Sequence, residues 1–314
     1  MGTGRSRADT VFKVLVLVFA SSIVALTLTF FYELTTGSSY TLREGLNFVT
    51  SSTWGGSIGN FFGVLPAVYG SVVTSAIALL IGVPVSLGVA IFLSELSPGR
   101  LRSPVSFVVE LLAAVPSVVY GLWGIFIMVP FLTVHVYPLF QVYLGFLPIF
   151  QGYPTGQLPG ASILDGGVVL AIMIIPIVSS ISRDALQAVP DSQREAAYAL
   201  GATRTEAIQI SVLSYARSGI LASIFLGLGR AFGETIAVAM VVGDTPRLSS
   251  SLFSPGYTLA SLIVTQFTEA TGPAYISALV EAGFVLLVVV FLTNIAARYL
   301  ISRLAKNREA ASYL

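Results

Sequence analysis

Long uncharged apolar stretches are the feature that most constrains what this chain can fold into. Hydrophobic residues make up 55% of its 314 residues and charged residues only 10%, whereas an ordinary soluble domain carries roughly 25% charged residues. A surface so poor in charge would not stay dispersed in water, and a disordered chain would be polar and highly charged. The remaining class is a polytopic α-helical membrane protein.

The polar residues exclude several functions. A net charge of +1 argues against nucleic-acid binding, which needs a basic surface. Because the chain has no cysteine, disulfides, thiolate metal sites and cysteine nucleophiles are absent. The single histidine, His135, is expected at the membrane interface rather than on a metal. We therefore expect no catalytic residue, metal or cofactor.

Six segments are long and apolar enough to cross a bilayer, which requires about 20 residues per helix. The first resembles a signal peptide, but its apolar run is longer than the roughly 7–15 residues of such a peptide, so we expect it to stay uncleaved. The pattern predicts an all-α protein with six transmembrane helices at about 11–32, 66–94, 104–133, 166–183, 218–243 and 274–298.

The basic residues predict the orientation. Cytoplasmic loops of membrane proteins carry an excess of Lys and Arg. Of the 16 basic residues, Arg43 and Arg247 fall on one side of the predicted spans and Arg230 lies within a span. All the others fall on the opposite side, which predicts a plasma-membrane protein with both termini in the cytoplasm.

Prolines within the spans predict kinks or breaks, because proline removes a backbone donor and clashes with the preceding turn. They are Pro84, Pro116 and Pro176. The segment 134–161 is rich in proline and aromatic residues and has no Lys or Arg. It could lie along the outer membrane interface, cap a pore or meet an outside partner.

The chain carries no site for driving transport with ATP. A phosphate-binding P-loop requires Gly-Lys followed by Ser or Thr, and neither Lys13 nor Lys306 follows a glycine. Gly227-Leu228-Gly229 lies within an apolar span rather than after a strand, so it is not a dinucleotide site. Any ATPase must be a separate subunit.

The loop between the fourth and fifth spans is the most informative polar segment. Asp191 or Ser192 can cap a helix after a proline, and residues 193–200 are mostly strong helix formers. Gly201 then separates this helix from a second one. The small side chains of Ala196, Ala197 and Ala199, with Glu195 and Arg204 at the rim, suit either a docking surface or an ordinary connector.

Glu195-Ala196-Ala197, followed after three residues by Gly201, resembles the EAA loop of ABC-importer permeases. The resemblance implies a type I ABC importer permease fold, in which loop 189–213 docks on cytoplasmic ATPase subunits and these four residues couple ATP hydrolysis to transport. The family pattern continues to Ile-x-Leu-Pro, whereas this chain has Ser211-Val212-Leu213-Ser214. The implied division is a tail, first helix and external segment in 1–65, a transmembrane domain in 66–302 and a cytoplasmic tail in 303–314.

Three further motifs resemble phosphate-importer permeases, and the C subunit (PstC-type) more than the A subunit. They are Phe62-Gly63-Val64-Leu65-Pro66, the run from Pro116 to Gly124, and the run from Gly229 to Val238. The resemblance implies phosphate as cargo, an A-type permease as heterodimer partner and an external phosphate-binding protein. The alternatives are another oxyanion such as sulfate or molybdate, the A-type subunit itself, or an ATP-independent channel or membrane sensor.

Arg230 is a charged residue within the fifth span. Arginine at bilayer depth costs about 2.5–3.5 kcal/mol, so it rarely faces lipid. Glu234 lies four residues on and is predicted on the same helix face. The two form either a self-neutralising pair or a charged lining of a translocation path for anions, and the resemblance favours the lining and adds Pro116 and Ser117 to it. By the same cost, Glu110 and Glu281 are expected to be structural or interfacial.

Overall fold

The computed structural model describes residues 7–38, 45–55, 61–151 and 160–311 as helices joined by short connections, and these residues form no strand, only two isolated β-bridges. Six helices or helical runs are long and apolar enough to cross a membrane, which confirms the predicted class and number. The long ones are α1 (Arg7–Gly37), α3 (Leu65–Ile91), α8 (Ile163–Gln187), α11 (Ser214–Gly233) and α14 (Pro273–Ala311). Arg5 and Arg43, used to predict orientation, lie outside the described residues.

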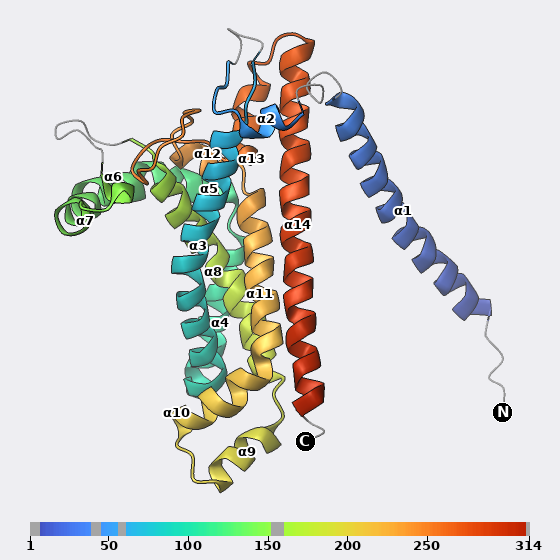
Figure 1. Ribbon diagram of the computed structural model, residues 1–314. Coiled ribbons are helices and arrows are strands. Elements are labelled where there is room, and N and C mark those ends of the chain that lie inside the picture. The colour runs from blue at the N-terminus through green and yellow to red at the C-terminus, as the bar shows by residue number, and fades with distance from the viewer. Residues whose placement is uncertain (1–6, 39–44, 56–60, 152–159, 312–314) are drawn as a thin grey trace.

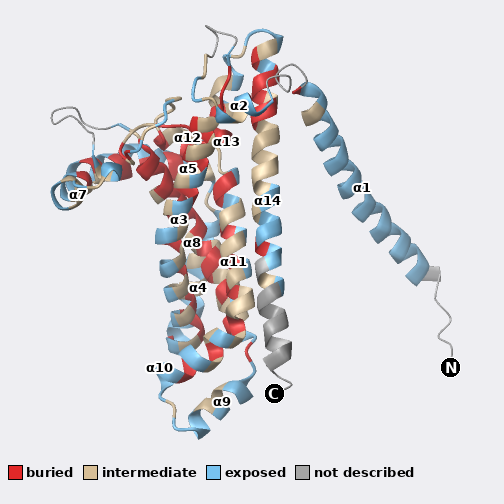
Figure 2. Cartoon of the chain, viewed as in Figure 1, coloured by how far each residue is buried: buried red, intermediate tan, exposed pale blue. Residues whose placement is uncertain are grey.

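Helix α8 is the centre of the bundle. In its most apolar stretch of 18 residues, 67% of the residues are buried, against 33% or less in every other span. Figure 2 shows buried residues in the middle of the bundle, where α8 packs between α3 and α11. Glycines allow the close approach. A Cβ on Gly167 would lie 2.6 Å from Cβ of Ile77, and one on Gly227 would lie 2.6 Å from Cγ2 of Val178.

The third predicted span, 104–133, is broken at Pro116, as its proline predicts, whereas Pro84 and Pro176 lie inside the unbroken helices α3 and α8. Helix α4 (Gly99–Ala114) ends before Val115 and Pro116, which are both extended, and α5 (Ser117–Trp123) begins directly after them. Proline disfavours the helical conformation at the residue before it. The hydroxyl of Tyr120 donates to the carbonyl oxygen of Leu112 at 2.8 Å, so it supplies a partner that the broken helix lacks.

Beyond α5 the chain stays helical and then leaves the bundle. It continues through a π-helical turn (Gly124–Met128), α6 (Val129–Phe131) and a second π-helical turn (Leu132–Val136) into α7 (Tyr137–Leu144). Figure 1 shows α7 running sideways from the end of the bundle opposite α9. A short 3-10 turn (Pro148–Phe150) leads back toward α8.

The fifth predicted span, 218–243, is also interrupted. Its helix starts earlier, with α10 (Arg204–Ala207) and a π-helical segment (Ile208–Leu213) leading into α11, and it ends at Gly233. Glu234 is extended, and α12 (Ile236–Val241) resumes the helix after Thr235. The prediction that Arg230 and Glu234 share one helix face is therefore wrong.

The end of the bundle opposite α9 is closed by short elements. Helix α2 (Leu46–Thr50) and α13 (Leu259–Phe267) pack with the start of α14 around Phe48, Phe62 and Tyr275. Helix α1 meets α14 near this end, where the hydroxyl of Ser277 donates to the Gly37 carbonyl at 2.9 Å, and diverges from it toward the α9 end. Helix α14 runs on to Ala311, so the predicted tail is largely helical.

Two glycines of α3 give a test of this packing. A Cβ on Gly70 would lie on the backbone carbonyl oxygen of Tyr257, whereas nothing lies within 4 Å of a Cβ on Gly88. We expect Gly70→Ala to lower the free energy of unfolding by about 1–3 kcal/mol, as overpacking does. Gly88→Ala, which improves helix propensity, should be neutral or stabilising. Unfolding of the purified protein in detergent measures both, and equal effects of the two substitutions would contradict the packing.

Candidate functional site

The first candidate site is the projecting loop after α8. Helix α9 (Asp191–Ala199) has no buried residue, and Glu195, Ala196 and Gly201 are exposed while Ala197 is half-buried. Leu200 at its end is 90% exposed. The two short helices separated at Gly201 confirm the prediction, although α9 begins at Asp191 without the predicted side-chain cap.

Gly201 ends α9 in a defined geometry. Its φ of 84° lies in the left-handed region, which glycine adopts without steric cost. Its N–H donates to the carbonyl oxygen of Tyr198 at 2.9 Å, and the N–H of Ala202 donates to that of Ala197 at 3.1 Å. This pair of bonds is a Schellman motif. Thr203 and Glu206 then form a reciprocal capping box at the start of α10.

Arg194 fastens α9 to the bundle. Its guanidinium donates to both carboxylate oxygens of Glu95, at 2.7 and 3.3 Å, and to the carbonyl oxygens of Val189 at 2.6 Å and Leu186 at 3.1 Å. Glu95 lies in the π-helical end of α3 (Phe92–Leu96), and the two side chains are 19% and 10% exposed. Hydrogen bonds to Glu95 raise the pKa of Arg194 further, so the guanidinium stays charged.

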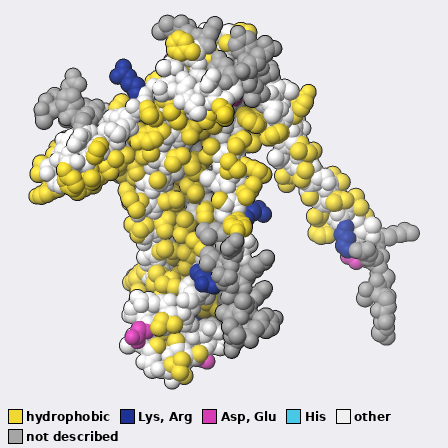
Figure 3. Space-filling view, viewed as in Figure 1, with side chains coloured by type: hydrophobic (Ala, Val, Ile, Leu, Met, Phe, Trp, Pro, Cys, Tyr) yellow, Lys and Arg dark blue, Asp and Glu magenta, His cyan; other side chains and the backbone are white. Residues whose placement is uncertain are grey.

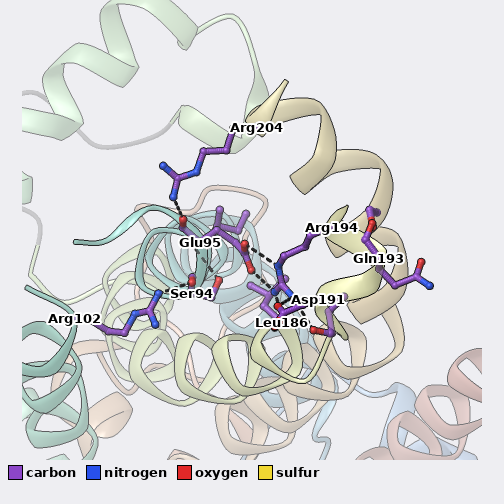
Figure 4. A network of polar contacts seen from close by, with 11 residues as sticks. Ser94, Glu95, Arg102, Leu186, Asp191, Gln193, Arg194 and Arg204 are labelled. Carbon is purple, nitrogen blue, oxygen red and sulfur yellow. Dashed lines mark hydrogen bonds and ion pairs between the residues drawn. The ribbon is translucent and has the colours of Figure 1, made fainter. Parts of the chain in front are cut away.

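Neighbouring contacts complete the attachment (Figure 4). Arg204 donates to the carbonyl oxygen of Glu95, and Arg102 donates to that of Ser94 at 2.7 Å. Ser211 donates to the carbonyl oxygen of Gln193 at 2.8 Å. Ser211 is one of the residues that depart from the EAA pattern, so this departure adds a contact between α9 and the start of the fifth crossing. The contacts of α9 therefore reach the ends of α3 and α8 and the π-helical segment that leads into α11.

The second candidate site lies where the two broken helices meet. Helices α5 and α12 pack against each other through glycine. A Cβ on Gly121 would lie 3.1 Å from Cα of Ala237, and one on Gly124 would lie 2.9 Å from Cγ1 of Val241. The breaks at Pro116 and Glu234 therefore belong to neighbouring helices, and each is the start of a half-helix that leads away from α9.

The predicted path residues surround these breaks. Arg230, in the last turn of α11, is exposed, and Glu234 is half-buried. Pro116 is exposed and Ser117 half-buried. Arg230 lies within electrostatic range of Tyr120, which links the two breaks. Among the described residues, no ion pair joins Arg230 to Glu234.

Other charged residues hold helices together. Glu110 accepts from Arg183 at 3.5 Å, which joins α4 to α8, in agreement with the structural role predicted for it. Glu281 is 4% exposed, within the packed start of α14.

His135 is exposed and stacks on Phe131 with ring centroids 4.9 Å apart. The described residues contain no group of three or more metal-ligating side chains.

Three residues of these sites were missed by sequence reasoning. Arg194 directly precedes the EAA residues, but its partner Glu95 is 99 positions away, so no local pattern reveals the pair. Tyr120 stands in the run that resembles phosphate-importer permeases, yet its contact across the helix break needed the structure. The sequence gives one indication of Glu95, which is that a single acidic residue ends a long apolar run.

A bundle with broken crossings and an exposed pair of short helices on one side is the architecture of an importer permease. The chain belongs to the family described as the binding-protein-dependent transport system inner membrane component, whose profile matches residues 82–306. It is accordingly a multi-pass membrane protein and a transport subunit rather than an enzyme.

Named relatives indicate which members of this family the chain is similar to. The chain is 43% identical over 307 residues to the "Phosphate transport system permease protein PstC" of Xylella fastidiosa, covering 96% of this chain and 93% of the relative. It is 44% identical to the protein of the same name from Mesorhizobium japonicum, covering 83% and 79%. A probable PstC of Methanocaldococcus jannaschii is 36% identical, covering 83% of each chain.

Solved structures support the fold. An inward-facing MetNI methionine ABC transporter matches with a TM-score of 0.55 and 16% sequence identity, over 77% of this chain and 95% of the transporter chain. A second crystal form of the same transporter gives a TM-score of 0.56. This likeness places the chain among ABC importer permease folds.

The Arg194–Glu95 pair is testable by a double-mutant cycle. Removing one partner leaves a poorly hydrated charge without its counter-charge, so Arg194→Ala is expected to cost about 2 kcal/mol of unfolding free energy. Glu95→Ala combined with Arg194→Ala should cost clearly less than the two single changes added together. Arg100→Ala, at an exposed position of the same end, is the control. Additive effects in detergent unfolding would show that the pair contributes no coupling.

Proposed function

We propose that this chain is the C-type permease subunit of an ATP-driven phosphate importer. The observation that carries the proposal is the exposed helix α9 with Glu195, Ala196, Ala197 and Gly201, fastened by Arg194 to helices that reach the broken crossings. The phosphate specificity rests on the relatives named as phosphate permeases. The proposed transmembrane domain is 66–302, preceded by the segment 1–65 and followed by the tail 303–314.

The orientation is proposed from the charges. Arg100, Arg102, Arg183, Arg194 and Arg204 all lie on elements at the α9 end, whereas Arg247 lies in the loop after α12 at the opposite end. Excess positive charge marks the cytoplasmic side. The α9 end then faces the cytoplasm, together with the start of α1 and the end of α14, and the opposite end faces an external phosphate-binding protein.

Two ATPase subunits would drive the cycle from the cytoplasm. Closure of an ATPase pair on ATP pushes α9, and the contacts of Arg194 and Arg204 transmit this displacement to the end of α3 and to α8. The helix breaks at Pro116 and Glu234 are the points where the crossings can bend. ATP hydrolysis then returns the path to the state that it had before the ATPase pair closed.

The translocation path is proposed to run along the face that carries Arg230, Glu234, Pro116 and Ser117. Helix α4 has no buried residue, so it presents a surface for a second, A-type permease that would complete the path. The Arg230 guanidinium is always charged and has a planar array of donors that suits phosphate oxygens. The N-terminal end of the helical run that starts at Ser117 also favours an anion. Glu234 would weaken the hold of Arg230 on the anion enough for release.

The experiment that tests the whole proposal is reconstitution of the chain in vesicles with the A-type permease, the ATPase and the external binding protein. Phosphate-loaded binding protein should stimulate ATP turnover, and sulfate or molybdate should not. Stimulation by another oxyanion instead would assign the cargo differently, and ATP turnover without any dependence on this chain would overturn the proposal.

Glu195→Lys is expected to uncouple the ATPase from transport, because it reverses a charge on the exposed face of α9. Phosphate uptake should fall at least about tenfold, the effect of about 1.4 kcal/mol, while the amount of inserted permease stays the same. Gln187→Lys places a lysine at the exposed end of α8, with a charge change of +1 against +2, and is the control. Parental uptake by Glu195→Lys would mean that α9 is not the docking surface.

Arg230→Gln is expected to abolish phosphate uptake but not assembly with the ATPase, since it removes the charge while keeping a polar side chain of similar length. Arg230→Lys keeps the charge without the planar array of donors, so it should retain part of the uptake. Both are measured as labelled-phosphate accumulation in vesicles. If Arg230→Gln accumulates phosphate like the parent, Arg230 does not line the path.

A further inference from the structure

The helical run that continues from α5 ends in a segment that lies outside the bundle. We call the π-helical turn Leu132–Val136 together with α7 (Tyr137–Leu144) the lateral arm. Figure 1 shows it projecting sideways from the bundle near the end opposite α9. It continues the helical run that begins after the break at Pro116.

The base of the lateral arm is firmly held. Tyr137 is 2% exposed, and its hydroxyl bonds the hydroxyl of Ser162 at 2.9 Å, which in turn donates to Asp165 of α8 at 2.7 Å. The Tyr137 ring also packs on Phe253 with centroids 4.4 Å apart. The sideways direction is therefore set by contacts with the bundle itself.

The remainder of the lateral arm and the turn after it expose large apolar side chains. Leu139 is 57% exposed, Val142 77%, Tyr143 73% and Phe146 74%. No Asp, Glu, Lys or Arg occurs anywhere between Glu110 and Asp165. Leaving such surface in water costs about 25 cal/mol per Å² of apolar area, so it needs a cover.

The surface around the lateral arm indicates what covers it. Figure 3 shows that the hydrophobic surface of the bundle continues onto the arm. The bundle surface faces lipid because the chain is a membrane protein, and the arm extends that same surface sideways from the bundle. Tyrosine and other amphipathic aromatics are enriched where hydrocarbon meets headgroups.

We propose that the lateral arm lies in the outer leaflet, at the boundary between headgroups and acyl chains, with Val142, Tyr143 and Phe146 in contact with lipid. The choice of the outer leaflet rests on the orientation given under the proposed function. The occupant of this surface is lipid rather than a soluble partner, because an external protein that binds reversibly would leave the same uncharged surface in water between encounters. The arm thereby holds the outer half of the third crossing at a fixed depth.

The absence of cysteine from the chain makes the test direct. Val142→Cys and Phe146→Cys are each labelled with a nitroxide and assembled, with cysteine-free partner subunits, into the complete importer in vesicles of phosphatidylethanolamine and phosphatidylglycerol. Collision rates with oxygen, which partitions into lipid, and with a water-soluble nickel chelate give the environment and depth. Leu46→Cys on α2, 81% exposed at the end of the bundle opposite α9, is the aqueous control, and Leu26→Cys within α1, 70% exposed, is the control for membrane depth.

The expected result is oxygen collision well above that of Leu46→Cys, nickel collision at least about threefold below it, and a depth shallower than that of Leu26→Cys. Nickel collision equal to that of Leu46→Cys would place the arm in water, and low collision with both reagents would place it under a protein partner; either result overturns the proposal. A nickel chelate sealed inside the vesicles identifies the leaflet, and quenching from inside overturns the outer assignment. Failure of phosphate to stimulate ATP turnover would refute the proposed function but leave the measured depth unaffected.

Discussion

The constraint on which this structure depends is that backbone polar groups inside a membrane need partners within the protein. Continuous helices meet it by themselves, whereas a break in a helix leaves backbone groups that need another partner. The break before α5 is bridged by the hydroxyl of Tyr120, and the break after α11 lies beside it through the contact of α5 with α12. The two interruptions thus form one weak zone in a bundle otherwise packed around α8.

At the α9 end of the bundle, by contrast, several contacts join the helices to one another. Arg194 contacts Glu95, Leu186 and Val189 at once, so α9 and the ends of α3 and α8 form one unit. Ser211 and Arg204 attach the start of the fifth crossing to the same unit. In the proposed function, this unit would receive the displacement from the ATPase, and the broken crossings would bend in response.

The sequence revealed those parts of the fold that follow from local pattern. The apolar runs predicted six crossings, and the spacing of Gly201 predicted two short helices, because both depend on neighbouring residues. Pro116 predicted a kink or break in the third span, and the helix is broken there, whereas the same signal at Pro84 and Pro176 falls inside unbroken helices. No proline lies next to Glu234 to indicate a break there, so the sequence predicts a continuous helix. The Arg194–Glu95 pair joins residues far apart in sequence, which no local signal reveals.

The uncharged stretch from α5 through the lateral arm has an electrical consequence. A membrane potential does work only on charge, about 2.3 kcal/mol for each elementary charge moved across 100 mV. Because no Asp, Glu, Lys or Arg lies between Glu110 and Asp165, a shift of α5 moves no charged side chain through the field. If Arg230 and Glu234 line the path as proposed, the voltage acts there on these two side chains and on the transported anion.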